Sequence, residues 1–404
     1  MTELDLRARD LLRRFPLIDG HNDLPWTLRE RAGGDVSKVC LSPAQAAPGD
    51  PGAVNLTAPV EGTHTDLPRL AAGGVGAQFW SVYVPASLAG DGAGGDGAGG
   101  NGAVTAVLEQ IDVARRMIAC YPEALELALT ADDVERIFAS GRVASLLGAE
   151  GGHAIAGSLG VLRMLYALGV RYLTLTHNAN VGWADSATDE PQAGGLTEFG
   201  RDVVREMQRI GMLVDLSHVA VSTMHHVLDV AQAPVIFSHS SARAVCDSPR
   251  NVPDEVLARL AGHGGVCMVT FVPGFVSQQC ADWTAGLKAE AARRGLDPRD
   301  FGQLFSLKPE WERAHPLPRA RLAQVADHVD HVREVAGVEH VGLGGDFDGT
   351  PDVTVGLEDV SAYPALFAEL LSRGWTESDC AALAGGNVLR VLRAAGTFAA
   401  RAQA

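Results

Sequence analysis

The chain has 404 residues, of which 47% are hydrophobic and 20% are charged, and its formal net charge at pH 7 is −16. This length and composition are typical of a globular protein with a substantial buried core. The strong negative charge argues against nucleic-acid binding and against docking on an anionic membrane. No run of about 18 apolar residues occurs, so we expect no transmembrane helix.

The first residues, MTELDLRARDLLRRFP, carry charges throughout, so they do not predict a signal peptide. The six cysteines are widely separated and show no CxxC spacing; they are Cys40, Cys120, Cys246, Cys267, Cys280 and Cys380. This distribution is not typical of a disulfide scaffold. We therefore expect a reduced, cytoplasmic enzyme.

Eight short apolar runs, rich in β-branched and aromatic residues, alternate with helical patterns along the chain. In order, the runs are 15–19, 77–84, 143–151, 171–178, 212–219, 234–241, 265–272 and 340–349. Helix-like stretches between them include 103–121, 195–211 and 254–264. Alternating strands and helices predict a parallel sheet, and eight such strands favour a (β/α)8 TIM barrel. A doubly wound open sheet is the alternative.

Two segments have the character of insertions. Residues 89–102, AGDGAGGDGAGGNG, are of low complexity and predict a flexible surface loop. Residues 276–320 carry charges and prolines, and we expect this segment to be partly helical and to overhang the mouth of the barrel. No internal repeat or domain boundary is apparent, so we expect residues 1–404 to form a single domain.

Side chains that can bind a metal follow five of the expected strands: His21 and Asp23, Glu150, His218, His239, and Asp346 with Asp348. Taken singly, each also suits a structural histidine, a turn residue or a helix cap. In a barrel, however, the carboxyl ends of the strands meet, and these groups would gather there. Imidazoles and carboxylates without thiolates suit zinc or a similar divalent ion. The set exceeds the needs of one ion, so two ions sharing a hydroxide are favoured, with Glu150 as the bridging carboxylate.

Eight motifs between about residues 15 and 395 carry a specific resemblance. In order, they are HNDLP, GAQFWSVY, LLGAEGGH, YLTLTHNANVGWAD, DLSHV, VIFSHSSAR, SPRNVPD and GGDFDG. Together they closely resemble the membrane (renal) dipeptidase family of binuclear zinc dipeptidases. That family belongs to the metal-dependent hydrolase superfamily and has a (β/α)8 barrel fold, which agrees with the eight expected strands.

The resemblance implies a catalytic domain with two Zn²⁺ ions per chain. His21 and Asp23 would bind one ion, His218 and His239 would bind the other, and Glu150 would bridge both. The implied activity is hydrolysis of dipeptides with a free C-terminal carboxylate, L,D-dipeptides included, by a metal-bridging hydroxide. The resemblance also implies a homodimer.

Three further residues match positions that act on the substrate in this family. His177 matches the histidine that binds the substrate and stabilises the tetrahedral intermediate. Arg250 matches the arginine that holds the terminal carboxylate, and Asp346 matches the aspartate that handles the proton of the bridging water. Phe275 stands near the position of a family tyrosine that also binds this carboxylate. His153, three residues after Glu150, is interpreted as structural or as a support for the ligands.

Two other functions are alternatives. The first is another amidohydrolase on the same binuclear site, with a lactam, lactone or N-acyl amino acid as substrate. Many such enzymes use a carboxylated lysine from the fourth strand and an HxH motif after the first, but this sequence has no lysine at a strand end and has His21-Asn22-Asp23 instead. The second is a non-catalytic binding barrel, which is disfavoured because no expected ligand is missing.

Overall fold

The computed structural model describes residues 2–35, 62–89, 102–299 and 301–403. Within them, parallel strands β1 to β9 span Leu17–Asn22, Val75–Ser81, Leu125–Leu127, Val143–Glu150, Val170–Thr174, Leu213–Asp215, Ile236–Phe237, Val266–Val269 and Val341–Leu343. Their order is β2-β1-β9-β8-β7-β6-β5-β4-β3, and β2 also pairs with β4. This last pairing closes an eight-stranded barrel. The predicted TIM barrel is confirmed, and the open sheet is wrong.

All eight expected strands are present, and β3 is an additional strand that the sequence did not predict. It has three residues and pairs only with β4, outside the closed barrel, with Leu125 opposite Val143. A segment this short carries too little alternation of apolar and polar residues to be recognised as a strand.

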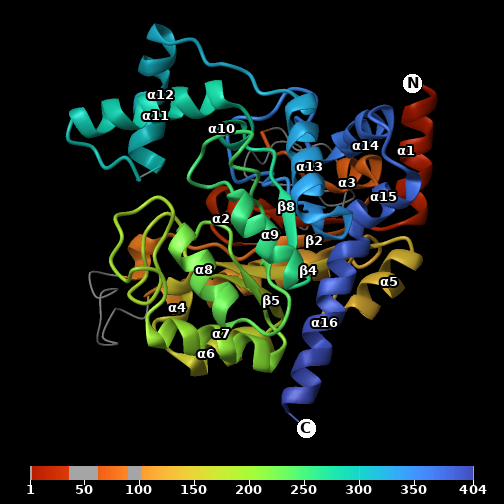
Figure 1. Ribbon diagram of the computed structural model, residues 1–404, viewed down its shortest axis with the longest axis horizontal. Helices are drawn as coiled ribbons and strands as arrows, with labels where there is room; N and C mark the ends of the chain where they lie inside the picture. Colours follow the sequence, from red (N-terminus) through yellow and green to blue (C-terminus); the bar gives the residue numbers. More distant parts are fainter. Residues whose placement is uncertain (1, 36–61, 90–101, 300, 404) are drawn as a thin grey trace.

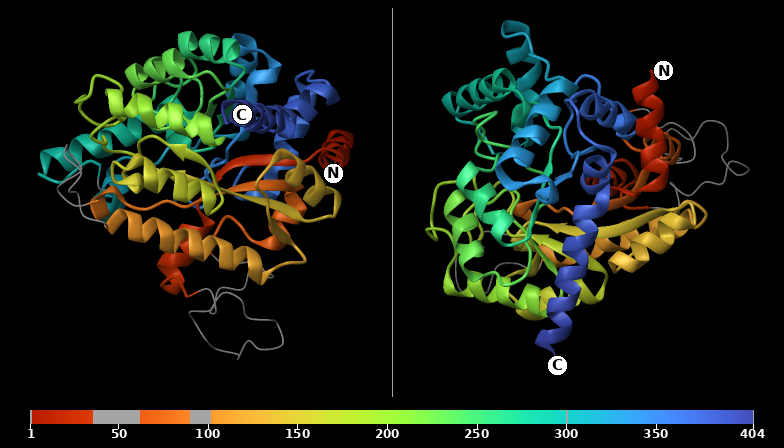
Figure 2. Two further views of the ribbon diagram at one scale, coloured as in Figure 1. Left: turned by 90° about the horizontal axis from the view of Figure 1, so that it is seen from below. Right: turned by 45° about the vertical axis from the view of Figure 1, so that its right-hand side comes forward.

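Helices surround the strands, as Figures 1 and 2 show. The helices between the barrel strands or after the last one include α4 (Gly102–Cys120), α5 (Ala131–Ala139), α6 (Leu159–Ala167), α7 (Glu198–Ile210), α8 (Val221–Val230), α9 (Asp254–Gly262), α13 (Leu322–Ala336), α14 (Tyr363–Ser372) and α16 (Asn387–Ala402). The three helices expected from the sequence are confirmed as α4, α7 and α9. Further helices are α1 (Glu3–Arg14), α2 (Leu24–Ala32), α3 (Leu67–Gly73) and α15 (Glu377–Ala381).

Helix α7 illustrates how local sequence sets these boundaries. The Thr197 side chain caps the first turn by accepting a hydrogen bond from the Gly200 amide. Gly211 ends the helix at φ 88°, a left-handed conformation that glycine adopts without steric cost. Between these ends, Val203 and Met207 lie one turn apart on the buried face.

A buried apolar cluster supports the floor of the barrel mouth. It includes the strand residues Ile18, Phe79, Leu146, Tyr172 and Met268. The rings of Phe79 and Tyr172 lie 5.1 Å apart, centroid to centroid. Burial of each such side chain contributes about 1.5–3 kcal/mol, so this cluster holds the strand ends above it in place.

The predicted insertion at 276–320 is partly helical, as expected. It contains α11 (Gln278–Arg293) and α12 (Phe301–Ala314), preceded by the short α10 (Pro273–Val276). Arg299 Nη1 lies 2.5 Å from Asp189 Oδ1, and Lys308 Nζ lies 2.6 Å from Asp352 Oδ1. These partners belong to the loops that leave the carboxyl ends of β5 and β9, so the insertion lies on the mouth side. The other predicted insertion, 89–102, falls almost wholly outside the described residues.

The cysteines correct one expectation. Cys246, Cys267, Cys280 and Cys380 are free and buried, but Cys120 is disulfide-bonded. The expectation that every cysteine is reduced is therefore wrong at Cys120, and the cytoplasmic location stays a prediction. Among the described residues, no helix is both long enough and apolar enough to cross a membrane.

Candidate metal centre

The barrel brings the predicted ligands to one place by ending its strands there. His21 lies near the end of β1 and Asp23 directly follows that strand, while Glu150 is the last residue of β4. His218, His239 and Asp346 lie on the loops that leave β6, β7 and β9. Because parallel barrel strands end at a common face, residues far apart in the sequence become neighbours.

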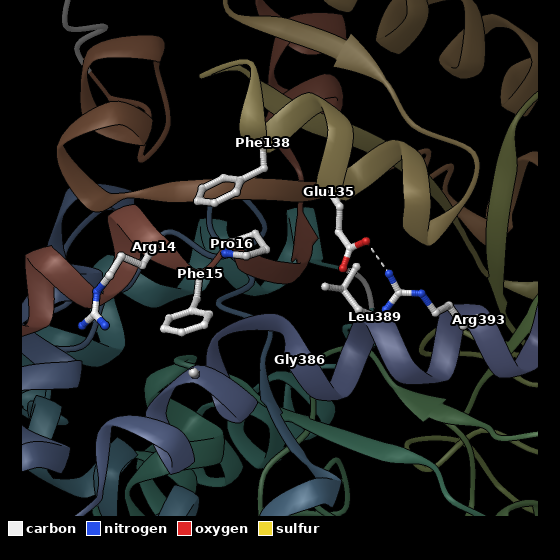
Figure 3. A pocket seen from close by; sticks show the side chains of 9 residues that line it. Arg14, Phe15, Pro16, Glu135, Phe138, Gly386, Leu389 and Arg393 are labelled. Carbon is white, nitrogen blue, oxygen red and sulfur yellow. Dashed lines mark ion pairs between the residues drawn. The ribbon is translucent and has the colours of Figure 1, made fainter.

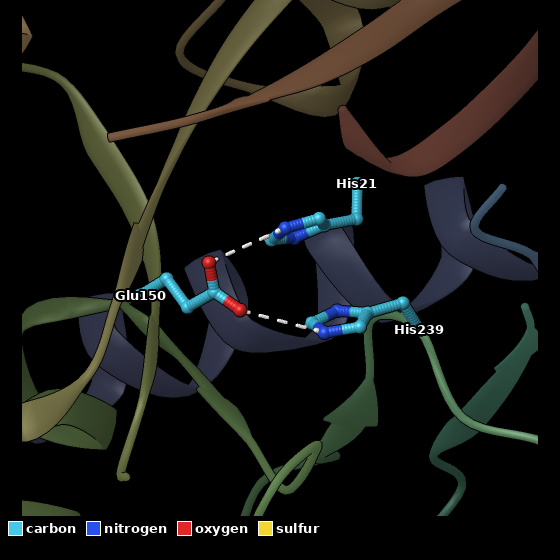
Figure 4. A group of neighbouring side chains, drawn as sticks. All are labelled: His21, Glu150 and His239. Atoms are coloured by element: carbon cyan, nitrogen blue, oxygen red, sulfur yellow. Dashed lines mark ion pairs between the residues drawn. The ribbon is translucent and has the colours of Figure 1, made fainter. Parts of the chain in front are cut away.

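Glu150 lies at the centre of the group. Its Oε2 is 3.5 Å from His21 Nε2, and its Oε1 is 3.5 Å from His239 Nε2 and 3.0 Å from His218 Nε2. Figure 4 shows the imidazoles of His21 and His239 approaching the two oxygens from one side of the carboxylate. Each carboxylate oxygen therefore faces a different histidine, which is the arrangement that a bridging ligand requires.

All the predicted ligands belong to three overlapping groups, each with its ligand atoms within 4.8 Å of one another. The groups are His21, Glu150 and His239; Glu150, His177 and His218; and His21, Asp23 and Asp346. Glu150 and His21 are each shared by two groups. The structure thus places together the residues predicted as ligands, which are His21, Asp23, Glu150, His218 and His239. Asp348, which was also expected to gather here, belongs to none of the groups found among the described residues.

A hydrogen bond from Tyr172 orients the imidazole of His21. The Tyr172 hydroxyl lies 2.8 Å from His21 Nδ1 and 3.2 Å from the Gly20 carbonyl, and when it donates to the carbonyl it accepts from Nδ1. The lone pair of Nε2 then faces the site, where this atom is buried without a hydrogen-bond partner. A metal-ligating histidine commonly has its other nitrogen held in this way.

The remaining donor atoms also fit a cation. Asp23 Oδ1 is buried without a partner, and His218 Nε2 and His239 Nε2 lie only 3.0 Å apart. Lone pairs that converge in a buried site are unfavourable unless a cation binds between them. Buried imidazoles and carboxylates are ligands that divalent transition ions and zinc accept. The residues therefore fit a divalent metal site.

The surroundings lower the pKa of Glu150 and raise the pKa of Asp346. Burial alone would raise the pKa of Glu150, but the imidazoles of His21 and His218 hold it well below its usual range. Burial raises the pKa of Asp346 well above its usual range, and the nearby carboxylates of Asp23 and Glu150 raise it further. Glu150 is thus suited to permanent negative charge, and Asp346 is suited to exchange a proton.

Unusual backbone conformations gather at the same site. Four non-glycine residues of the described chain have positive φ, and three of them are His218 (69°), Asp346 (60°) and Asp348 (65°). A left-handed conformation costs such residues about 1–3 kcal/mol and persists only where the surroundings enforce it. The loops after β6 and β9 therefore hold these side chains in position at some cost in stability.

His177 lies beside this group on the loop after β5. Its Nε2 is 4.0 Å from Glu150 Oε1, and its ring is 4.5 Å from that of His218 and 4.8 Å from that of Tyr83, centroid to centroid. Burial lowers the pKa of His177 to about 4, so the imidazole is neutral at pH 7. A neutral imidazole keeps one N–H group that can donate to an oxyanion.

Arg250 is buried on the segment after β7, and two of its nitrogen atoms have no hydrogen-bond acceptor. Its Nη1 contacts the Ser240 hydroxyl at 3.5 Å, while Nε and Nη2 are buried without partners. Burial lowers the pKa of Arg250 to about 10, so it stays charged at pH 7. The Phe275 ring lies 5.0 Å from Cζ, so this aromatic side chain contacts the guanidinium through its ring.

Sequence reasoning missed the residues that hold the ligands. Asp19 Oδ1 accepts from the His21 amide, and its Oδ2 accepts from the Tyr363 hydroxyl. Asp215 accepts from the Ser217 amide in the same way. The available signal was a buried aspartate two or three residues before a ligand histidine. His153 donates to the Val84 carbonyl at 2.8 Å, which agrees with its structural interpretation.

The whole chain matches one protein family. The family model described as membrane dipeptidase (peptidase family M19) matches residues 6–404. The chain belongs to this family. Among its relatives, dipeptidase 3 from Mus musculus is 42% identical over 392 residues, which make up 96% of this chain and 66% of the mouse protein.

Solved structures agree with the barrel. The probable dipeptidase PvdM from Pseudomonas aeruginosa has a TM-score of 0.81 at 23% identity, covering 98% of this chain and 99% of its own. A metallopeptidase from Rhodobacter sphaeroides, bound to a phosphinate mimic of the dipeptide L-Ala-D-Ala, has a TM-score of 0.72 at 24% identity, covering 94% and 99%. These likenesses show a shared fold.

A separate cavity lies at the other end of the barrel. It has a volume of about 370 Å³ and is bordered by Phe15 and Pro16, which precede β1, together with residues of α5 and α16 (Figure 3). Its cations are already paired, because Arg14 contacts Glu377 and Arg393 contacts Glu135. The predicted functional residues lie at the opposite ends of the strands, so this cavity is not part of the candidate metal centre.

Proposed function

We propose that this protein is a metal-dependent dipeptidase that requires a free C-terminal carboxylate on its substrate. The observation that carries the proposal is the unpaired edge of Arg250. Nε and Nη2 form one side of the guanidinium fork, and such an edge binds a carboxylate through two parallel hydrogen bonds. Membership of the membrane dipeptidase family supports the reaction type.

We assign two zinc ions to the centre. His21 and Asp23 would hold one ion, His218 and His239 would hold the other, and Glu150 would bind both. Bound ions of this kind acidify a water molecule, which supplies the nucleophile, and polarise the scissile carbonyl. Glu150 supports this assignment because its two oxygens face histidines of the two different sites.

The roles of the other side chains follow from their surroundings. Arg250 would orient the substrate by its terminal carboxylate and so place the peptide bond against the centre. His177, neutral and partly buried, would donate to the oxygen of the tetrahedral intermediate. Asp346 would accept a proton and pass it to the leaving amine, a task that suits a carboxyl group with a raised pKa.

We include L,D-dipeptides among the substrates. The phosphinate mimic of L-Ala-D-Ala bound by the Rhodobacter sphaeroides protein makes L-Ala-D-Ala the natural first compound to assay beside L-Ala-L-Ala. Arg250 fixes the carboxylate and does not by itself select the configuration at the adjacent carbon.

The test compares kcat/KM for free, C-amidated and N-acetylated forms of both dipeptides. The free dipeptides should be cleaved well and the amidated ones poorly. Arg250→Met should lower kcat/KM for the free dipeptides by about 10- to 100-fold, the effect of losing a charge-assisted hydrogen bond of about 1.5–3 kcal/mol. Arg243→Met, on the same segment, is the matched control and should retain activity.

Equal cleavage of free and amidated dipeptides would contradict the role of Arg250. Efficient cleavage of N-acyl amino acids or lactams without dipeptide cleavage would assign the centre to another amidohydrolase reaction.

A further inference from the structure

Asp215 is a buried carboxylate for which the proposed mechanism has no use. Its side chain has no exposed surface, and no cation within the described chain forms an ion pair with it. It instead accepts four hydrogen bonds. Oδ1 accepts from the amides of Ser217 at 3.1 Å and Ser238 at 2.8 Å, and Oδ2 accepts from the hydroxyls of Ser238 at 2.6 Å and Thr174 at 2.5 Å. A charged group buried without an ion pair is rare and calls for a function.

The hydrogen bonds around Ser238 have a fixed direction. Its hydroxyl has one proton, and the Asp215 carboxylate at 2.6 Å is a better acceptor than the Ser217 hydroxyl at 3.4 Å. With that proton committed, Ser238 Oγ can only accept from His239 Nδ1, which lies 2.8 Å away. The proton of the neutral His239 imidazole is therefore on Nδ1.

This tautomer directs the other nitrogen of His239 at the metal centre. Nε2 has a lone pair and lies 3.5 Å from Glu150 Oε1 and 3.0 Å from His218 Nε2. His218 lacks a similar support, because its Nδ1 is buried without a partner. Between the two histidines assigned to this metal ion, the hydrogen-bonded chain therefore reaches only His239.

We propose that Asp215 is a positioning residue that acts through Ser238 to hold His239 in its metal-binding tautomer. The proposal rests on the proposed function only in taking His239 as a metal ligand. Partners of this kind typically change metal affinity by about 10- to 100-fold when they are removed. At the other site, the Tyr172 hydroxyl lies 2.8 Å from His21 Nδ1 and orients that imidazole by a different route.

Replacement of Asp215 by asparagine should reverse the direction of the hydrogen bonds that run from residue 215 through Ser238 to His239. The two backbone amides require an oxygen acceptor, so the asparagine carbonyl would stay on their side and its NH₂ group would face Ser238. Ser238 Oγ would then accept from that NH₂ group and donate its own proton to His239 Nδ1. The imidazole proton would move to Nε2, where it blocks metal binding.

The experiment is a Zn²⁺ titration of the metal-free, full-length protein in competition with a chromophoric chelator. Asp215→Asn should weaken binding of one of the two zinc ions by about 10- to 100-fold, and Ser238→Ala should weaken it by less. The double variant should bind as Ser238→Ala does, because without the hydroxyl Asp215 has no route to His239. Ser241→Ala removes a buried hydroxyl that contacts the Thr270 carbonyl, and should bind zinc as the wild type does.

The proposal would be overturned if Asp215→Asn bound zinc with wild-type affinity. It would also be overturned if Asp215→Asn lowered zinc affinity as much in the Ser238→Ala background as in the wild type. If Asp215→Asn does not fold, the comparison of zinc affinity between Ser238→Ala and Ser241→Ala decides. Equal zinc affinities of these two variants would overturn the proposal. Absence of zinc binding by the wild type would instead contradict the proposed function, so the two failures are distinguishable.

Discussion

Gly349 shows how little space surrounds the carboxylates of the centre. A Cβ at this position would lie 2.4 Å from both Asp23 Oδ2 and Asp346 Oδ1. Gly349→Ala should therefore displace both carboxylates and lower kcat/KM by about a hundredfold, the effect of a misplacement near 1 Å. Steady-state assay of L-Ala-L-Ala cleavage checks this, with thermal unfolding to verify the fold.

The matched control for this change is Gly262→Ala at the end of α9, where a Cβ would meet no atom within 4 Å. It should leave kcat/KM unchanged. Near-wild-type activity of Gly349→Ala would mean that the positions of Asp23 and Asp346 do not matter to the reaction.

At the scale of residues, the sequence predicted which side chains gather but not what holds them. His21, Glu150 and His239 could be recognised because they stand at the ends of apolar runs. The spacing of Asp215 before His218 is a local signal, but its connection through Ser238 to His239 could not be recognised, because it depends on the direction of hydrogen bonds between different strands. Such directions follow from three-dimensional contacts that no local pattern encodes.

His328 ties α13 to two other segments. Its Nδ1 accepts from the Ala242 amide at 3.1 Å, so Nε2 donates to the Val276 carbonyl at 3.0 Å. Burial lowers the pKa of His328 to about 4, against about 6.5 in the unfolded chain. The neutral form therefore contributes stability that is present above pH 6.5 and is lost as the pH falls towards 4.

His328→Gln is the variant that tests this linkage, because the Gln amide can make both hydrogen bonds but does not titrate. Between pH 7 and pH 5 the wild type should lose about 2 kcal/mol more free energy of unfolding than the variant. Urea denaturation of both proteins at the two pH values measures this difference in unfolding free energy. The contributions of other titrating groups cancel because both proteins contain them. An equal loss in both proteins would contradict the role of His328.

At the scale of elements, long and strongly patterned segments were predictable and short ones were not. Helix α7 was expected at 195–211 and spans Glu198–Ile210, since its capping residues and buried face are local features. Strand β3 was missed because its three residues depend on pairing with β4. Tertiary contacts, which a single segment does not carry, define such elements.

The whole molecule should respond to zinc as a ligand of the folded state. Without a cation, the carboxylates of Glu150, Asp23 and Asp346 lie close together among the histidine side chains, and Asp23 Oδ1 is buried without a hydrogen-bond partner. Zinc at about a thousand times its Kd should stabilise the folded protein by about 4 kcal/mol and raise Tm by several degrees. Differential scanning fluorimetry of the metal-free protein with and without Zn²⁺ measures this.

Magnesium is the control for this measurement, because it prefers octahedral oxygen ligands and should give a much smaller shift than zinc. A Tm that zinc leaves unchanged would show that the described side chains do not form a metal site in the folded protein.

The barrel itself could be predicted because its strands alternate regularly with helices, and closure needs only their number and order. The disulfide at Cys120 could not, because six scattered cysteines indicate no pairing. The fold brings the candidate ligands together at the carboxyl ends of the barrel strands.

The most direct test of the metal centre is a count of metal ions per chain by elemental analysis, on wild type and Glu150→Gln purified with added zinc. Two ions bridged by one carboxylate predict about two per wild-type chain and at most about one in the variant. Wild-type protein without bound metal, or a variant that binds as many ions as the wild type, would contradict this account.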